Sequence, residues 1–148
     1  MRAGVWAVVA TLLALFGAAG EASAQAPACA KTDFEGVVNE AAGALRDLNR
    51  KNTPPFQAKL IQLKDKRNWS HDQFLKEAAP FVRYEEIAGY DQKSEQLLAR
   101  ITGGGQASGA GPDCALLTEL RGALKVLVET QVAKWTYMAA KLDKELAK

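Results

Sequence analysis

The sequence predicts an all-α fold: a small disulfide-pinned helical bundle of about five helices with a long C-terminal helix. Apolar residues recur at spacings of three and four through most of the chain, which is typical of helices with one buried face. Capping patterns mark several helix starts. Few segments alternate apolar and polar residues as strands do. With 148 residues, the chain has room for one domain.

Composition excludes several classes of protein. The chain carries 19 basic and 17 acidic residues, so neither a strongly basic nucleic-acid binder nor an acidic tail is expected. Charged residues make up 24%, which is ordinary for a folded chain. One His and two widely separated Cys form neither a zinc-ligand set nor a haem attachment motif. We therefore predict no metal and no cofactor.

The first 24 residues have the pattern of a secretory signal peptide. Arg2 supplies a positive start, residues 5–16 form an apolar run too short to span a bilayer, and residues 22–24 have the small-x-small form of a cleavage site. The alternatives are an uncleaved N-terminal anchor and lipid attachment at Cys29. Cleavage would leave residues 25–148 as a single helical domain without a membrane span. We expect it in the periplasm if the source is bacterial, and secreted otherwise.

Export bears on the two cysteines, Cys29 and Cys114. An oxidising compartment favours a disulfide between them, and the alternative is a pair of reduced, buried thiols. The closed loop would contribute on the order of 4 kcal/mol in the chain-entropy model. Export also argues against nucleic acid as a partner.

Two helices are expected before residue 70. Thr32 and Glu35 have the spacing of a capping box, which opens a helix that residues 49–53 end. A second helix then begins at residues 53–55, because proline is tolerated in a first turn. The expected inner faces are Phe34, Val37, Val38, Ala41, Leu45 and Leu48, then Phe56, Leu60 and Leu63.

A third and a fourth helix are expected between residues 70 and 102. Ser70 and Gln73 form a second capping box, and Pro80 should kink or break the third helix near Ala79. Gly89 to Asp91 should reverse the chain, with Asp91 capping the fourth helix. The expected inner faces are Phe74, Leu75, Ala78, Phe81 and Val82, then Leu97, Leu98 and Ile101.

The last helix follows a Gly-rich segment. Residues 103–112 should stop the fourth helix and form a flexible loop, and Asp113 should cap a helix that runs to the C-terminus. Its apolar residues from Leu117 to Leu146 repeat at about 3.6 residues, the period of a straight helix. The disulfide would place the first and last helix starts at one end. An up-and-down bundle then needs an odd number of helices, which is why we expect five.

The long last helix is the expected binding element. Either the shorter helices stack end to end along it, or its final turns project and expose an apolar stripe. An exposed stripe would bind a protein partner, a second copy or a lipid-like ligand, and the alternative is ordinary core. Its residues are Trp135, Tyr137, Met138, Leu142 and Leu146.

The second hypothesis is a carrier of a small apolar or aromatic ligand, held between helices by Phe74, Phe81, Trp135 and Met138. An enzyme is not expected, since no Ser–His–acid order, metal triad or phosphate loop is present. Basic residues dominate 46–67 and acidic residues dominate 72–95. We expect these segments to attract one another across exposed edges; a basic patch for anionic lipid is the alternative.

Overall fold

The computed structural model describes residues 29–107 and 113–148 and confirms an all-α, disulfide-pinned bundle with a long C-terminal helix. Its described part holds four α-helices and one short 3₁₀ helix, and no strand. They are α1 (Lys31–Lys66), α2 (His71–Ala78), η1 (Ala79–Phe81), α3 (Glu85–Ala107) and α4 (Cys114–Leu146). The signal segment, and residues 108–112 of the predicted loop, lie outside the described residues.

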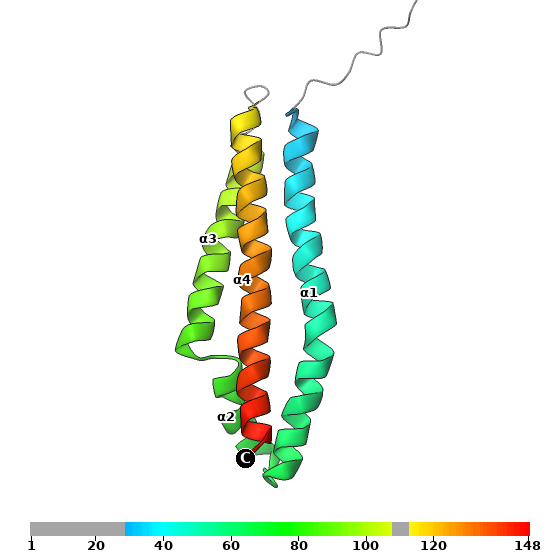
Figure 1. Ribbon diagram of the computed structural model, residues 1–148, viewed down its shortest axis with the longest axis vertical. Coiled ribbons are helices and arrows are strands. Elements are labelled where there is room, and N and C mark those ends of the chain that lie inside the picture. Colours follow the sequence, from blue (N-terminus) through cyan, green and yellow to red (C-terminus); the bar gives the residue numbers. More distant parts are fainter. Residues whose placement is uncertain (1–28, 108–112) are drawn as a thin grey trace, which may run out of the picture.

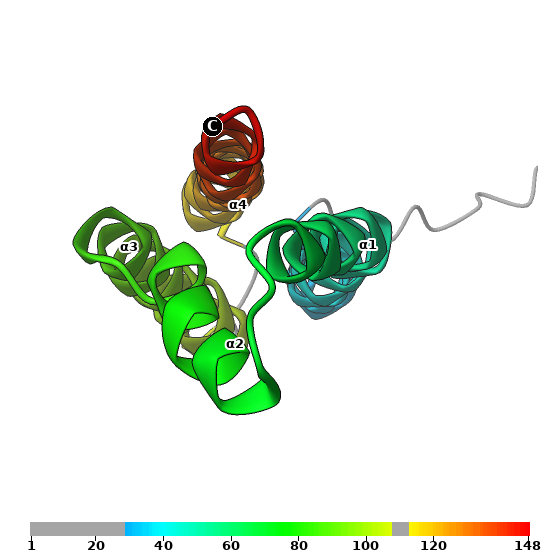
Figure 2. The same cartoon turned by 90° about the horizontal axis from the view of Figure 1, so that it is seen from below.

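Three parallel rods form the bundle (Figure 1). The first is α1 and the last is α4, and both run from the disulfide end, called here the upper end, to the lower end. The middle rod consists of α2, η1 and α3 placed end to end and runs back up. Seen along the axis, α2 lies on the side of the bundle away from α4 (Figure 2). Because the disulfide joins the starts of the first and last helices, an up-and-down bundle needs an odd number of rods. The structure has three such rods instead of the five helices that we expected.

The two expected N-terminal helices are one continuous helix, so the predicted break at residues 49–53 is wrong. Pro54 and Pro55 lie inside α1. Each proline removes a hydrogen bond to the carbonyl four residues earlier. Both prolines, and the Arg50 and Lys51 residues that lose those bonds, are exposed, so water can satisfy the freed carbonyls. The buried face formed by Phe56, Leu60 and Leu63 continues the helix beyond them.

The helix of the middle rod is interrupted at Pro80, not at Gly89. The predicted break near Ala79 is confirmed, because α2 gives way there to the 3₁₀ helix η1. Gly89 and Asp91 lie within α3, so the predicted reversal at residues 89–91 is wrong. Ile87 is 1% exposed and anchors the first turn of α3 in the core, which extends this helix back past Gly89.

The glycines at 103–105 do not stop α3, which continues to Ala107. Gly104 and Gly105 instead allow close packing between helices. A Cβ added at Gly104 would lie 2.7 Å from Leu120 Cδ2, and one at Gly105 would lie 2.7 Å from Val38 Cγ2. The missing side chains therefore let α3 approach both α4 and α1, and this packing outweighs the poor helix propensity of glycine.

Local caps set the helix starts. Ser70 accepts from the Gln73 amide and the Gln73 side chain accepts from the Ser70 amide, which confirms the predicted capping box. Asp113 also caps α4 as predicted, accepting from the Leu116 amide at 2.9 Å. The first cap is displaced by two residues. Ala30, not Thr32, precedes α1, and its amide donates to Asp33 Oδ2 at 2.9 Å.

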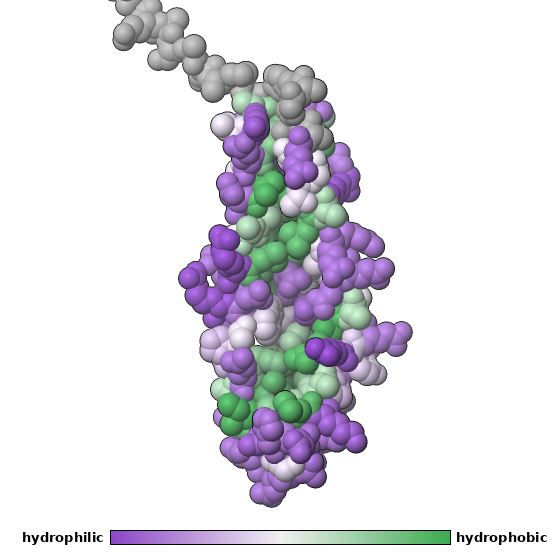
Figure 3. Space-filling model, turned by 180° about the vertical axis from the view of Figure 1, so that it is seen from behind, coloured by the Kyte–Doolittle hydropathy of each residue, from purple (hydrophilic) through white to green (hydrophobic). Residues whose placement is uncertain are grey.

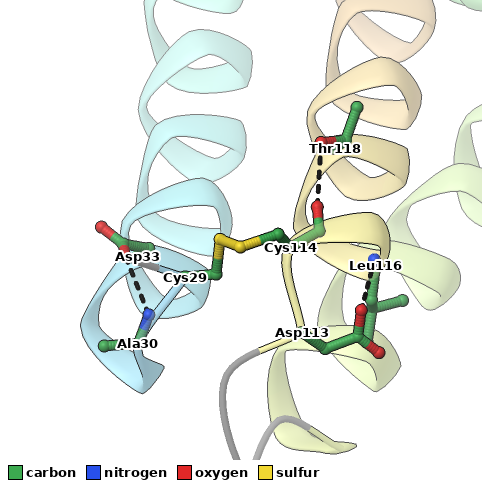
Figure 4. Close-up of a disulfide and its surroundings, with 7 residues drawn as sticks. All are labelled: Cys29, Ala30, Asp33, Asp113, Cys114, Leu116 and Thr118. Atoms are coloured by element: carbon green, nitrogen blue, oxygen red, sulfur yellow. Dashed lines mark hydrogen bonds between the residues drawn. A yellow bond between two sulfur atoms is a disulfide. The ribbon is translucent and has the colours of Figure 1, made fainter. Parts of the chain in front are cut away.

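The predicted disulfide joins Cys29 and Cys114, whose Cα atoms are 5.0 Å apart (Figure 4). It ties the residue before Ala30 to the first residue of α4, so the two longest helices are joined covalently at their starts. The bond spans 85 residues of sequence. It closes the upper end of the bundle next to the two helix caps.

Two apolar clusters fill the bundle. The upper one is built from α1, α3 and α4 around Phe34, Ile101 and Leu127. The lower one adds η1 and centres on Leu63, Ile87 and Leu142. The face opposite α4 shows apolar residues above and below a more polar band (Figure 3). Inside the bundle, Ser94 and Thr130 are the buried polar residues of the described chain.

Candidate functional site

The apolar stripe predicted on the last helix is packed into the lower cluster. Met138 is 4% exposed and Leu142 is fully buried. Trp135, Tyr137 and Leu146 pack against the same cluster and are half-buried. Of the two arrangements that the long helix permits, the structure has the stacked one: the final turns of α4 do not project.

Helix lengths explain this arrangement. The 33 residues of α4 span about 50 Å and the 23 residues of α3 about 35 Å. The remaining length is covered by α2 and η1, which continue the middle rod downward (Figure 1). Trp135 packs edge-on against Phe56 of α1, with 5.9 Å between ring centroids. The stripe therefore has helices on more than one side.

A different apolar surface remains open, in a groove of about 560 Å³ between α1 and the α2–η1 segment. We call it the α1–α2 groove. Its α1 wall consists of Gln57, Leu60 and Ile61. The opposite wall consists of Phe74, Leu75, Ala78 and Ala79, followed by Val82 and Arg83.

Exposed apolar side chains are concentrated in this groove. Of the six large hydrophobic residues that are most exposed in the described chain, three line it: Ile61 (54%), Leu75 (60%) and Val82 (40%). The others are Tyr84, Val126 and Val132, none of which lines it. Water therefore contacts a gathered set of aliphatic side chains at one place.

These apolar side chains are exposed because α2 packs only partly against the bundle. It buries none of its residues, although Phe74, Leu75 and Ala78 share one face. Leu75 and Val82 were expected to face inward, and this expectation is wrong for both. Pro80 converts the helix to a 3₁₀ turn after Ala78. Of the predicted inner face, only Phe81 is fully buried, while Phe74 and Ala78 pack partly buried against the lower cluster.

The structure brings the four residues of the predicted ligand pocket together at the lower cluster, where they pack. Among its four residues, only Phe74 lines the α1–α2 groove. Phe81 and Met138 are buried in the lower cluster, and Trp135 packs against it. Phe74 packs against the same cluster as well as lining the groove. The role of the four residues in contacting a ligand stays a prediction.

Contacts at the lower end fix the middle rod to α4. Lys141 Nζ lies 3.6 Å from the ring centroid of Tyr84 and donates a hydrogen bond of 3.1 Å to the carbonyl of Pro80. One lysine of α4 thereby holds both sides of the turn between η1 and α3. Burial, and then the neighbouring Glu86 carboxylate, raise the pKa of Tyr137, which lies beside this turn.

The basic segment of α1 pairs with α4 and not with residues 72–95, so the expected partner was wrong. Lys59 donates to Asp143 at 2.5 Å, and Arg67 lies 3.5 Å from Glu145. The acidic segment supplies a partner elsewhere, since Lys134 of α4 pairs with Asp91 of α3. A hydrogen bond from Lys148 lowers the pKa of Glu145, with Arg67 and Lys144 adding to the effect.

The groove is not lined by any described side chain that could act as nucleophile, general acid or general base. Its only ionisable lining residue is Arg83, and it holds no Ser, Thr, Cys, His or carboxylate. In the described ranges, no three His, Cys, Asp or Glu residues are grouped closely enough to hold a metal ion. None of the helices described is long and apolar enough to cross a bilayer. These observations leave apolar contact as the chemistry that the groove offers.

Comparison with protein-family models, with curated proteins and with solved structures finds no match to this chain. The geometry of the groove therefore carries the functional argument.

Sequence reasoning missed three groove residues, Gln57, Ile61 and Arg83. A signal for Ile61 was present, because a large aliphatic residue next to Leu60 falls outside the stripe of Phe56, Leu60 and Leu63. Such a residue points about 100° away from its buried neighbour on the helix. No comparable signal marked Arg83, whose position depends on where the chain turns after Pro80.

Proposed function

We propose that this protein acts by binding, as an exported carrier of a small apolar ligand held in the α1–α2 groove. The observation that carries the proposal is the gathering of three exposed aliphatic side chains, Ile61, Leu75 and Val82, at one groove. Exposed aliphatic groups gathered in a concave surface are a common feature of binding sites.

The size of the groove supports a small ligand. Ligand pockets are commonly about 300–1,000 Å³ and mostly apolar, and the groove, at about 560 Å³, falls in this range. Contact through the last helix has less support, because Met138 and Leu142 are buried. The disulfide supports export, since such bonds persist in oxidising compartments.

Binding of N-phenyl-1-naphthylamine, a neutral apolar fluorophore, tests the proposal. Ile61→Ser and Leu75→Ser remove aliphatic surface from the two walls of the groove, and we expect each to weaken binding about tenfold. Val132→Ser is the matched control, because Val132 is similarly exposed (45%) but lies outside the groove. Thermal unfolding of each variant would show that the fold is retained.

Two results would contradict the proposal. One is an absence of saturable fluorophore binding by the native protein at micromolar concentrations. The other is equal weakening by Val132→Ser and by the two groove variants, since this would show binding that is not localised to the groove.

A further inference from the structure

Resting on the proposed carrier function, we propose that the ligand is a single-chain carboxylate amphiphile, such as a fatty acid, with its alkyl chain in the α1–α2 groove and its carboxylate on Arg83. The inference names the chemical class of the ligand and the residue that would recognise its polar end.

Among the described residues, the only charge that lines the groove is positive. Arg83 is the only charged residue of the lining, and no acidic side chain lines the groove with it. In the described part of the chain, Arg83 forms no ion pair with another side chain. Its guanidinium is therefore available to a ligand, and its fork of N–H groups matches the two oxygens of a carboxylate.

The acidic side chains near Arg83 form no ion pair with it within the part of the chain that the structure describes. Arg83 also lines a smaller neighbouring pocket that contains Glu85 and Asp91. Asp91 pairs with Lys134, and Glu85 is exposed at the start of α3. Among the ion pairs of the described residues, none joins Glu85 to Arg83. Neither carboxylate lines the α1–α2 groove itself.

The polar residues of the groove lie toward one end. α1 descends along the bundle, whereas α2 and η1 rise obliquely from the lower end (Figure 1). Gln57 is the first lining residue on the descending wall and Arg83 is the last on the ascending wall. They therefore lie toward the same, upper, end, and the aliphatic residues lie below them. This is the distribution of an amphiphile: one polar end and one apolar body.

The volume of the groove favours a flexible alkyl chain over a peptide helix as the ligand. Three turns of a helix about 10 Å wide displace about 1,200 Å³, roughly twice the volume of the groove. A second copy of this chain would have to present an acidic residue to Arg83 beside an apolar ridge of matching shape. A single alkyl chain fits between Ile61 and Leu75 without either requirement.

Displacement of the bound fluorophore by dodecanoate, below its critical micelle concentration, and by dodecan-1-ol, below its solubility limit, tests the inference. The two probes differ only in the head group. We expect the native protein to bind dodecanoate about five- to tenfold more tightly at low salt, with a smaller preference at high salt. Arg83→Gln should remove this preference and leave dodecan-1-ol binding unchanged. Lys76→Gln, which removes an exposed cation of α2 outside the groove, should change neither affinity.

The outcomes separate the inference from the proposed function. Equal binding of both probes, with no effect of Arg83→Gln, overturns the carboxylate inference and leaves the apolar carrier standing. Failure of both probes to displace the fluorophore overturns the inference as well. If sedimentation instead shows a concentration-dependent dimer that Ile61→Ser dissociates, the occupant is a second copy. Saturable binding of an amphipathic helical peptide that outcompetes dodecanoate would likewise contradict the inference.

Discussion

The side-chain amide of Gln131 in α4 donates a 2.7 Å hydrogen bond to Ser94 Oγ in α3. Ser94 Oγ in turn donates to the carbonyl of Tyr90 at 2.8 Å. These bonds cross the bundle between the two apolar clusters, where the adjacent Lys134–Asp91 pair joins the same helices. The polar layer fixes the register of α4 against α3, because a shift along the axis would leave these polar groups without partners.

Truncating one partner of the Gln131–Ser94 hydrogen bond should lower the free energy of unfolding more than truncating both partners. Ser94→Ala leaves the Gln131 amide without its partner, and we expect the free energy of unfolding to fall by about 1–2 kcal/mol. The double variant Ser94→Ala with Gln131→Leu removes both polar groups and should recover most of this loss. Urea unfolding of the single and double variants measures the coupling. Strict additivity would show that the two side chains act independently.

Two adjacent glycines should respond oppositely to alanine. A Cβ at Gly104 would lie 2.7 Å from the buried Leu120 side chain, so Gly104→Ala should destabilise the fold by about 1–3 kcal/mol. A Cβ at Gly103 meets nothing within 4 Å, so Gly103→Ala should stabilise it by about 0.5–1 kcal/mol through helix propensity. Thermal unfolding of the two variants provides the comparison. Stabilisation by Gly104→Ala would refute the close packing of α3 on α4.

Loss of the Cys29–Cys114 disulfide should destabilise the bundle by about 2–5 kcal/mol. The reason is that an 85-residue separation leaves a large loop unconstrained in the unfolded chain. Denaturant unfolding of the Cys29→Ser, Cys114→Ser double variant measures the loss. The native protein in a reducing buffer should reach the same midpoint as this variant. A native protein whose midpoint is insensitive to reductant would be inconsistent with the bond.

Glu145 should make the lower end sensitive to acid. Its pKa is lowered from 4.5 chiefly by the hydrogen bond from Lys148, so the folded state favours the ionised carboxylate. This contribution is complete above pH 4.5 and is lost as the pH falls through the lower folded-state pKa. Glu145→Gln should therefore lower the melting temperature at neutral pH, and the difference from the native protein should shrink in acid. A difference that grows in acid would contradict this sign.

The sequence predicts the fold class because its strongest signals are local. The caps at Ser70 and Asp113 and the break at Pro80 are all read from short patterns, and the structure confirms each. The buried faces of α1 and α4 follow from the same 3.6-residue period. These features depend on neighbours within a few positions, and so they are accessible without a structure.

The predicted helix boundaries are wrong where tertiary packing overrides the local preference of the sequence. Pro54 and the glycines at 103–105 favour a break, yet each lies in a continuous helix because the residues beyond it bury an apolar face or pack closely. The α1–α2 groove could not be foreseen for the same reason. It depends on how far α2 stands from α1, and no pattern within either segment encodes that distance.

Backbone amide chemical shifts during a titration with dodecan-1-ol test the central claim most directly. The account predicts saturable shifts concentrated in residues 57–61 and 74–83, the two walls of the α1–α2 groove. Shifts concentrated instead around Val126 and Val132 on α4, or spread evenly over the bundle without saturation, would contradict a carrier function located in this groove.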